Sequence, residues 1–577
     1  MTNQPTVQYG GLKQVFAVSL GLFLVFLDST VVNIALPTII EDYGITLSVA
    51  SWIINAFVLT LAVLLVTFGK LADMFGRSRF FLIGLVIFTI SSFFCGIAPN
   101  EEVLIVARVL QGIGGAMIIP ASMMLVRTAV PPEKTGLAMG IWGAVGALAV
   151  AVGPSLGGVV TEYINWRWVF YINVPVVVLS YPFIRIAFKG HHDVRTPFSL
   201  DFWGIATLSA GLYFLTYAIL QGEELGWTSQ VIYLYFGISL VSALLFVLIE
   251  RKVRQPLVDF TIFQNRHYVG GILSNFLGGI LLMGTLILLP IYFTQVKGYD
   301  TLQSSFLITP LSAVMLVVAP MIGRLIDRIG YFMPMVLGYI FTVAGFALLV
   351  NLDANASLKH LVFVMIMLGT GLGIIMVTSV TVCTASVSDK QVSLGSGIFA
   401  TSRNMGGAIG VSLFVSLTLS FLNTYSSEIV DKGITRFQKA ELPSQVTEQA
   451  IARLEKQRSN FFEEAKKLGE FKISAELRQQ TIVKKKQEVL QTLPQGAQLP
   501  PQVEKEIETK VDAELQSIEK EVNDIQGDIR DDAETYLVKA MTKAFWSGLI
   551  LAVVCSGSLL FLRKRAVDAA LDTAVTE

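Results

Sequence analysis

Long apolar runs alternate with short polar loops along most of the 577 residues. About 20 apolar residues in a helix cross the hydrocarbon core of a bilayer, so each run is predicted to be a membrane-spanning helix. Fourteen runs of that length occur, at 14–36, 50–68, 80–98, 103–126, 136–160, 168–188, 202–220, 231–249, 269–293, 304–323, 333–351, 360–382, 395–422 and 541–562. The pattern predicts an all-α integral membrane protein.

Basic side chains gather in alternate loops between these runs. One set of loops carries Lys70, Arg77, Arg79, Arg127, Lys134, Arg324 and Arg328. The other set carries mainly acids, among them Glu41, Asp42, Glu101 and Glu102. Because cytoplasmic loops retain Lys and Arg, the basic loops are predicted to be cytoplasmic. An even number of spans then places both termini in the cytoplasm, as in a multi-pass protein of a bacterial-type inner or plasma membrane.

One loop sequence occurs twice. The segments 69–76 and 323–330 both read Gly, a basic residue, Leu, one variable residue, Asp, two variable residues and Gly. Two six-helix bundles related by duplication, with two helices inserted between them, explain this repeat, and they predict a solute site near the midplane between the bundles. The expected domains are an N-terminal bundle at 1–190, the inserted helices at 191–267, the first part of the C-terminal bundle at 268–424, an extracytoplasmic helical hairpin at 425–540, and the last spanning helix with a cytoplasmic tail at 541–577.

Composition separates the hairpin from the rest. The chain is 53% hydrophobic with a mean hydropathy of +0.64 and no net charge, yet 425–540 holds nearly half of its charged residues. Within this block, apolar residues recur at spacings of three and four after Pro500 and Pro501, which is typical of a coiled-coil seam. They are Val503, Ile507, Val511, Leu515, Ile518, Val522, Ile525 and Ile529. An antiparallel hairpin with arms of about 50 Å is the simplest interpretation.

One carboxylate stands alone in the first apolar run. From Val15 to Leu36 the only ionisable side chain is Asp28. A carboxylate in the hydrocarbon zone costs roughly 2.5–3.5 kcal/mol on insertion scales, so it needs a polar cavity, a partner or a proton. We expect Asp28 to face a polar cavity and to couple protons to a moving solute. The polar residues Asn33, Gln111 and Asn275 are expected to line that cavity.

The loop and helix motifs carry a resemblance. The segment 69–79 is similar to the signature cytoplasmic loop of the major facilitator superfamily, and 27–39 resembles the first-helix motif of its fourteen-helix drug/proton antiporter branch. Met74 departs from the family pattern, which usually has Arg there, whereas Arg328 keeps that position in the second copy. The resemblance implies a conformational latch between the bundles. The residues assigned to it are Gly69, Asp73, Gly76, Arg77, Gly323, Arg324, Asp327, Arg328, Gly330 and Arg403.

Two more motifs extend the resemblance. Arg108 lies in a stretch that resembles the fourth-helix motif, in which the Arg is implicated in proton transfer. Helical rise puts Arg108 about 10 Å and Asp28 about 18 Å from the outer surface, which leaves open whether they touch or whether water or Gln111 intervenes. Gly153, Pro154, Gly157 and Gly158 resemble the motif that marks antiporters. The aromatic segment around Trp166, which includes Asn173, is assigned to an interfacial belt.

The expected function is proton-coupled antiport that exports amphiphilic drugs or related lipophilic compounds by alternating access. Two alternatives stay open: a carrier of a lipid or cell-envelope precursor that uses the hairpin, and a membrane scaffold that binds partners through it. A periplasmic or cell-envelope adaptor is considered as a partner of 430–535. No phosphate-binding loop, cofactor motif, metal motif or nucleic-acid motif occurs, so a non-enzymatic carrier that works as a monomer, without cofactor, is expected.

Overall fold

The computed structural model describes residues 11–188, 201–253, 256–299, 301–352, 356–387, 391–440, 442–456, 458, 471–491 and 499–562. The chain forms two compact units. The first, here called the transmembrane unit, comprises Met1–Ser416 and Phe545–Glu577, and the second, the hairpin unit, comprises Leu417–Ala544. The predicted cytoplasmic ends, 1–10 and 563–577, lie outside the described residues.

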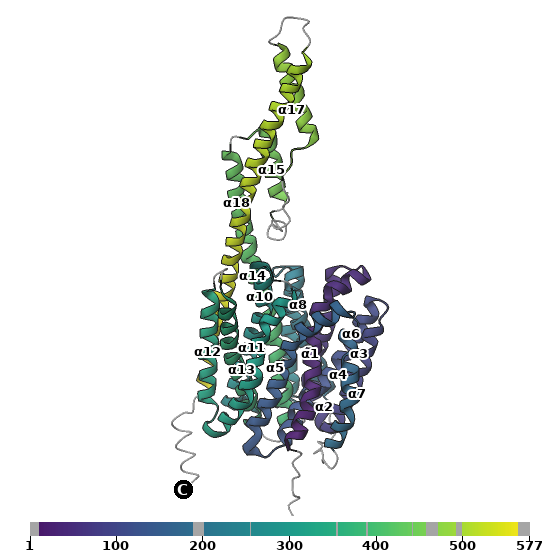
Figure 1. Cartoon of the computed structure of the whole chain (residues 1–577). Helices are drawn as coiled ribbons and strands as arrows, with labels where there is room; N and C mark the ends of the chain where they lie inside the picture. Colours follow the sequence, from purple (N-terminus) through teal and green to yellow (C-terminus); the bar gives the residue numbers. More distant parts are fainter. Residues whose placement is uncertain are drawn as a thin grey trace, which may run out of the picture. The chain divides into compact units, whose positions relative to one another are not determined.

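The prediction of fourteen spans is confirmed, because the structure has 14 helices long and apolar enough to cross a membrane. The helices of the N-terminal bundle are α1 (Gly11–Tyr43), α2 (Leu47–Phe75), α3 (Arg77–Ile97), α4 (Glu101–Thr128), α5 (Thr135–Tyr163), α6 (Trp168–Tyr171) and α7 (Asn173–Ala187). The inserted pair is α8 (Phe202–Leu225) and α9 (Gln230–Glu250). The C-terminal bundle has α10 (Arg266–Ile291), α11 (Thr301–Ile329), α12 (Phe332–Val350), α13 (Leu358–Ala385) and parts of α14 (Val392–Lys439) and α18 (Pro501–Cys555), followed by α19 (Leu559–Leu562) (Figure 1).

Both copies of the repeated loop end a helix in the same way. Gly76, after α2, has φ 97° and donates its backbone N–H to the carbonyl of Ala72 at 3.0 Å. Gly330, after α11, has φ 76° and donates to the carbonyl of Ile326 at 2.9 Å. Only glycine adopts a positive φ without a steric penalty, so the last glycine of the motif has a conformational reason to be there.

Small residues hold the helices of each bundle close together. A Cβ on Gly114 of α4 would lie 2.6 Å from the backbone nitrogen of Phe88 in α3. In the C-terminal bundle, a Cβ on Gly406 of α14 would lie 2.1 Å from the carbonyl oxygen of Phe276 in α10. Lipid tails are as apolar as leucine, so helices in a membrane associate through such close backbone approach.

The inserted pair touches one helix from each bundle. The hydroxyl of Ser412 in α14 donates to the carbonyl of Ile219 in α8 at 3.0 Å. On the other side, the rings of Trp52 in α2 and Tyr217 in α8 lie 5.5 Å apart. The helices α8 and α9 therefore lie beside the boundary between the bundles.

The hairpin unit is built from the ends of α14 and α18 together with α15 (Ser444–Lys456) and α17 (Ala475–Gln491) (Figure 1). Its helices α14 and α18 are antiparallel, since Tyr425 packs on Tyr536 and Arg436 pairs with Asp532 at 2.9 Å. Of the predicted seam, four residues are buried and the other four are partly buried. The buried ones are Val511, Leu515, Val522 and Ile529.

The spanning helices and the hairpin are not separate elements. We predicted a thirteenth helix at 395–422 and a fourteenth at 541–562, but α14 and α18 each run on without interruption through both units. The interior of each helix holds no proline, and a change from apolar to charged side chains does not by itself end a helix. The sixth span also differs, because it is divided into α6 and α7 at Ile172.

Candidate functional site

Asp28 lies inside the N-terminal bundle and is fully buried. Its carboxylate accepts hydrogen bonds from Arg108 Nη1, from Gln111 Nε2 at 2.8 Å and from Asn173 Nδ2 at 3.1 Å. These donors come from α4 and α7, so the carboxylate closes a contact among helices of one bundle. The expectation that Asp28 faces an open polar cavity is wrong for this conformation, because three donors occupy its oxygens.

Arg108 is fully buried as well, and it contacts Asp28 directly. Its Nε donates to the carbonyl of Ile53 at 2.9 Å, and its Nη1 donates to Gln111 Oε1 at 2.6 Å. The guanidinium also lies 4.3 Å from the ring centre of Phe57. The sequence left open whether Asp28 and Arg108 touch or whether Gln111 lies between them. In the structure they form a direct ion pair, and Gln111 also hydrogen-bonds to each of them. A long arginine side chain covers the difference in depth that helical rise alone predicts.

Two residues of this network were missed in the sequence. Ser92 in α3 accepts from Gln111 Nε2 at 2.6 Å and from Asn173 Nδ2 at 3.2 Å. Asn173, assigned above to the aromatic belt, is fully buried at the start of α7 and bonds to Asp28. The amide of Asn173 inside an apolar run indicates in the sequence that this residue needs a polar partner. The sequence could not identify that partner, because Asp28 is 145 positions away.

The network makes a buried charge tolerable. Breaking a buried ion pair by removing one partner costs about 3–5 kcal/mol, because the other charge is left uncompensated. Asp28 and Arg108 cancel in net charge, and the neighbouring amides supply further hydrogen bonds. The network, here called the carboxylate network, consists of Asp28, Ser92, Arg108, Gln111 and Asn173.

The three predicted substrate-cavity residues do not come together. Gln111 belongs to the carboxylate network and is fully buried. Asn275 is also fully buried, and its Nδ2 donates to the carbonyl of Phe399 and to the hydroxyl of Ser402, both at 2.8 Å. Each amide is therefore used inside its own bundle, and neither lines an accessible cavity here. Asn33 is exposed on α1 and stays a predicted cavity residue.

The second copy of the repeated loop joins the two bundles. The carboxylate of Asp327, near the end of α11, accepts backbone N–H bonds from Gly136 at 3.0 Å and Leu137 at 3.3 Å. These N–H groups belong to the first turn of α5 and have no partner within that helix, and the helix dipole favours a negative charge at this position. A Cβ on Gly323 would lie 2.4 Å from the carbonyl oxygen of Gly136.

The first copy makes a different contact. Asp73 accepts from Arg77 Nε at 2.9 Å, four residues along the same loop. Gly69, Asp73 and Gly76 are buried, and Gly76 forms the turn described above. Near this end of the unit, Arg127 of α4 donates to the carbonyl of Thr384 in α13 at 2.5 Å. The bundles are therefore in contact at the end that carries the basic loops, here called the basic end.

The remaining predicted latch residues divide into two groups. Arg324 and Arg328 are exposed at the basic end, and Gly330 forms the turn after α11. Arg403 is not at that contact: its guanidinium lies 4.5 Å from the ring centre of Phe26 in α1. Its side chain extends across the boundary between the bundles to α1, and its assignment to the latch stays a prediction.

The glycines of α5 contact two different partners. Near the basic end, a Cβ on Gly140 would lie 2.7 Å from the carbonyl oxygen of Ala319 in α11. Further along, a Cβ on Gly153 would lie 1.9 Å from Thr30 Oγ1, and one on Gly157 would lie 2.8 Å from the carbonyl oxygen of Val31. Of the other two motif residues, Pro154 lies inside the helix and Gly158 is partly buried. One helix thus contacts both the opposite bundle and the turn that follows Asp28.

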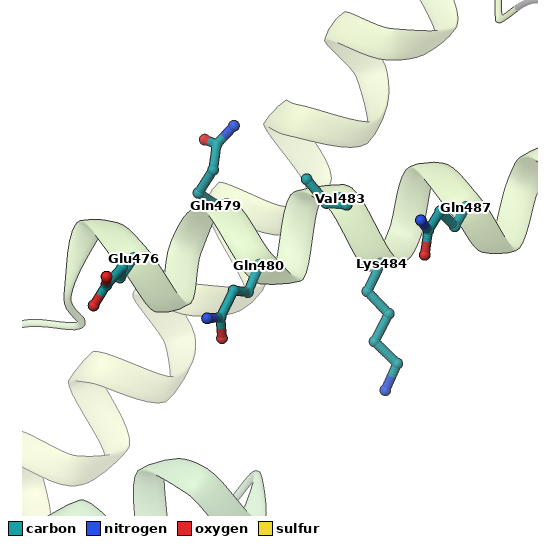
Figure 2. A pocket seen from close by; sticks show the side chains of 6 residues that line it. All are labelled: Glu476, Gln479, Gln480, Val483, Lys484 and Gln487. Atoms are coloured by element: carbon teal, nitrogen blue, oxygen red, sulfur yellow. The ribbon is translucent and has the colours of Figure 1, made fainter.

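The hairpin unit offers no comparable polar centre among its described residues. A shallow surface depression on α17 is lined by Glu476, Gln479, Gln480, Val483, Lys484 and Gln487 (Figure 2). All six side chains come from one helix, so they cannot enclose a solute. The buried polar chemistry described above belongs to the transmembrane unit.

Comparison with known proteins agrees with this arrangement. The model of the Major Facilitator Superfamily matches residues 18–411. The chain belongs to this superfamily. The match ends before the hairpin unit begins at Leu417, so it covers the helices that carry the carboxylate network and the Asp327 contact.

Several relatives carry names that refer to drug resistance. The multidrug resistance protein Stp of Mycobacterium tuberculosis is 31% identical over 73% of this chain and 79% of its own. The multidrug transporter protein MdtP of Bacillus subtilis is 30% identical over 68% of this chain and 73% of its own. The puromycin resistance protein of Streptomyces alboniger is 31% identical over 73% of this chain and 84% of its own.

A solved structure shows the same fold. The crystal structure of the human organic anion transporter MFSD10 superposes with a TM-score of 0.52 and 17% sequence identity, over 72% of this chain and 94% of that one. At this identity the likeness concerns the fold alone. The chain is therefore a multi-pass membrane transporter of the major facilitator fold.

Proposed function

We propose that this protein is a proton-coupled antiporter that exports amphiphilic, lipophilic compounds through the plasma membrane of a bacterium. The names of its relatives support export of drugs, and the buried pair of Asp28 and Arg108 supports the coupling to protons. That pair is the observation on which the proposal depends. An intramembrane ionisable residue is by default a candidate for transport chemistry.

Protonation would change the network directly. A neutral Asp28 no longer cancels the charge of Arg108, and one of its oxygens becomes a donor instead of an acceptor. Arg108 keeps its bonds to the carbonyl of Ile53 and to Gln111, but it loses its counter-charge. The contact among α1, α4 and α7 is weakened as a result, and α1 gains freedom to move.

Helix α5 provides a physical route from this site to the basic end. It packs on Thr30 and Val31, which follow Asp28 by two and three residues. At its first turn it binds Asp327 of the other bundle. A shift of α1 therefore acts on a rigid element whose other end holds the bundles together.

The cycle we infer takes the basic end as cytoplasmic, following the distribution of Lys and Arg. The structure then represents a conformation closed toward the cytoplasm. A proton taken up from the outer side neutralises Asp28 and permits the bundles to rock, and its release to the cytoplasm restores the ion pair. One charge that crosses the membrane supplies about 2.3 kcal/mol per 100 mV.

The test is transport of a lipophilic dye in proteoliposomes with an imposed pH gradient. We expect Asp28→Asn to abolish gradient-driven transport. The matched control is Asp42→Asn, which removes an exposed acid from the end of the same helix and leaves transport intact. Dye movement at the normal rate in Asp28→Asn would refute the proposal.

A further inference from the structure

Arg403 is a cation placed at mid-depth between the bundles. It lies eleven residues after the first residue of α14. At the rise of an α-helix, this is about 16 Å from the start of that helix. Its guanidinium carbon lies 4.5 Å from the ring centre of Phe26 in α1. Because α14 belongs to the C-terminal bundle and α1 to the N-terminal bundle, this contact crosses the boundary between them.

Among the residues that the structure describes, Arg403 has no counter-charge, unlike Arg108. Within the described ranges, its guanidinium makes neither an ion pair nor a hydrogen bond, and it makes a cation–π contact with the face of Phe26. The side chain of Arg403 is partly buried. A charge at this depth is costly without a partner, and an aromatic face compensates for part of that cost.

Four helices meet around this contact. The ring of Phe26 also packs against α5, since a Cβ on Gly146 would lie 3.0 Å from it. On the other side, a Cβ on Gly279 of α10 would lie 2.9 Å from the carbonyl oxygen of Arg403. Helices α5 and α10 therefore pack against the parts of α1 and α14 that carry this contact. This is the position at which a carrier that alternates its access would hold a solute.

We propose that Arg403 and Phe26 form a subsite for the anionic group of an amphiphilic solute, such as a carboxylate or a sulfonate. The guanidinium supplies the charge and several N–H donors, and the ring of Phe26 supplies an apolar surface for the aromatic part of the solute. The inference rests on the proposed export function and adds the charge class of the substrate. The inference predicts that the protein binds acidic lipophilic solutes more tightly than neutral ones of the same shape.

The experiment uses two fluorescent probes with one ring system, dansylate (an anionic sulfonate) and dansyl amide (its neutral counterpart). Equilibrium binding to the purified full-length protein is measured without a pH gradient, so it does not depend on proton coupling. The normal protein is expected to bind dansylate more tightly than dansyl amide. Arg403→Gln should weaken dansylate binding by about tenfold or more and leave dansyl amide within about twofold, as expected for the loss of a charge-assisted contact.

Two further variants separate recognition from folding. Arg403→Lys keeps the charge and should retain part of the preference, whereas Phe26→Leu keeps apolar volume and should weaken dansylate binding by about threefold. Arg453→Gln removes an exposed cation of α15 and should change neither affinity. Unchanged dansylate binding in Arg403→Gln, equal loss of both probes, or no preference in the normal protein would overturn the inference. The export proposal fails in a separate measurement: it is refuted if Asp28→Asn still transports dye under a pH gradient.

Discussion

The two bundles use their acids in opposite ways. In the N-terminal bundle, Asp28 is held by donors of that same bundle, from α4 and α7. In the C-terminal bundle, Asp327 is held by backbone N–H groups of the other bundle, at the first turn of α5. The first acid stabilises one bundle from inside, while the second stabilises one relative position of the two bundles. A carboxylate buried within one bundle and a carboxylate that joins two bundles therefore have different environments.

The largest effect is expected from Arg108. Arg108→Gln leaves Asp28 buried without its counter-charge and should lower the stability by about 3–5 kcal/mol. The double variant Asp28→Asn with Arg108→Gln should recover much of this loss, because no uncompensated charge remains. Thermal unfolding in detergent measures both. Equal loss in the single and double variants would show that the pair is not what holds this bundle.

A smaller effect is expected from crowding the contact between bundles. In Gly136→Ala the new Cβ would lie 2.4 Å from Asp327 Oδ1 and 2.6 Å from the carbonyl oxygen of Gly323. Overpacking of this kind costs about 1–3 kcal/mol, so the closed conformation should be less populated. Ala144→Cys places a thiol at a buried position of α5. A thiol reagent should label it faster when the contact between the bundles at the basic end opens.

Gly143→Ala is the matched control for that experiment. It adds the same methyl group on α5, but the nearest atom would be Val377 Cγ2 at an ordinary 3.5 Å. Labelling of Ala144→Cys should stay slow in its presence. If both alanine variants accelerate labelling equally, the close approach of Gly136 to Asp327 is not what keeps this end closed.

The two copies of the repeated loop can be compared by parallel substitutions. Asp327→Asn removes the negative charge that faces the first turn of α5 and should weaken closure by about 0.3–2 kcal/mol, the range for a charge near a helix end. Asp73→Asn should change the same labelling rate less, since Arg77 of the same loop is its partner at 2.9 Å. An equal change in both variants would mean that the two copies act alike.

The smallest effect is expected from an exposed pair of the N-terminal bundle. Hydrogen bonds from Arg167 and Trp166 lower the pKa of Asp42 below its ordinary value of 3.8. A lowered pKa means that the contribution is fully present above pH 3.8 and is lost as the pH falls through the lowered value. Because the pair is exposed, Asp42→Asn should cost less than about 1 kcal/mol at neutral pH and nothing in strong acid. Unfolding measured at both pH values checks the sign.

The seam of the hairpin unit and the spans were accessible to sequence reasoning because both depend on local spacing. The recurrence of apolar residues from Val503 to Ile529 predicts a packed face, and the structure buries or partly buries all eight positions. The lengths of the apolar runs predict the spans in the same way. The ends of α14 and α18 could not be predicted, since no residue interrupts either helix where the solvent changes.

By itself, the sequence determined the number of spans, the duplication of the loop and the need of Asp28 for a partner. Those properties follow from length, repetition and the cost of a charge in hydrocarbon. Only the tertiary structure decided that Arg108, Gln111 and Asn173 are the partners, that Asp327 binds α5, and that Arg403 lies on Phe26. The reason is that lipid-facing and buried faces of a spanning helix are equally apolar. Its rotation toward its neighbours is therefore fixed by close backbone approach and by polar contacts between distant segments.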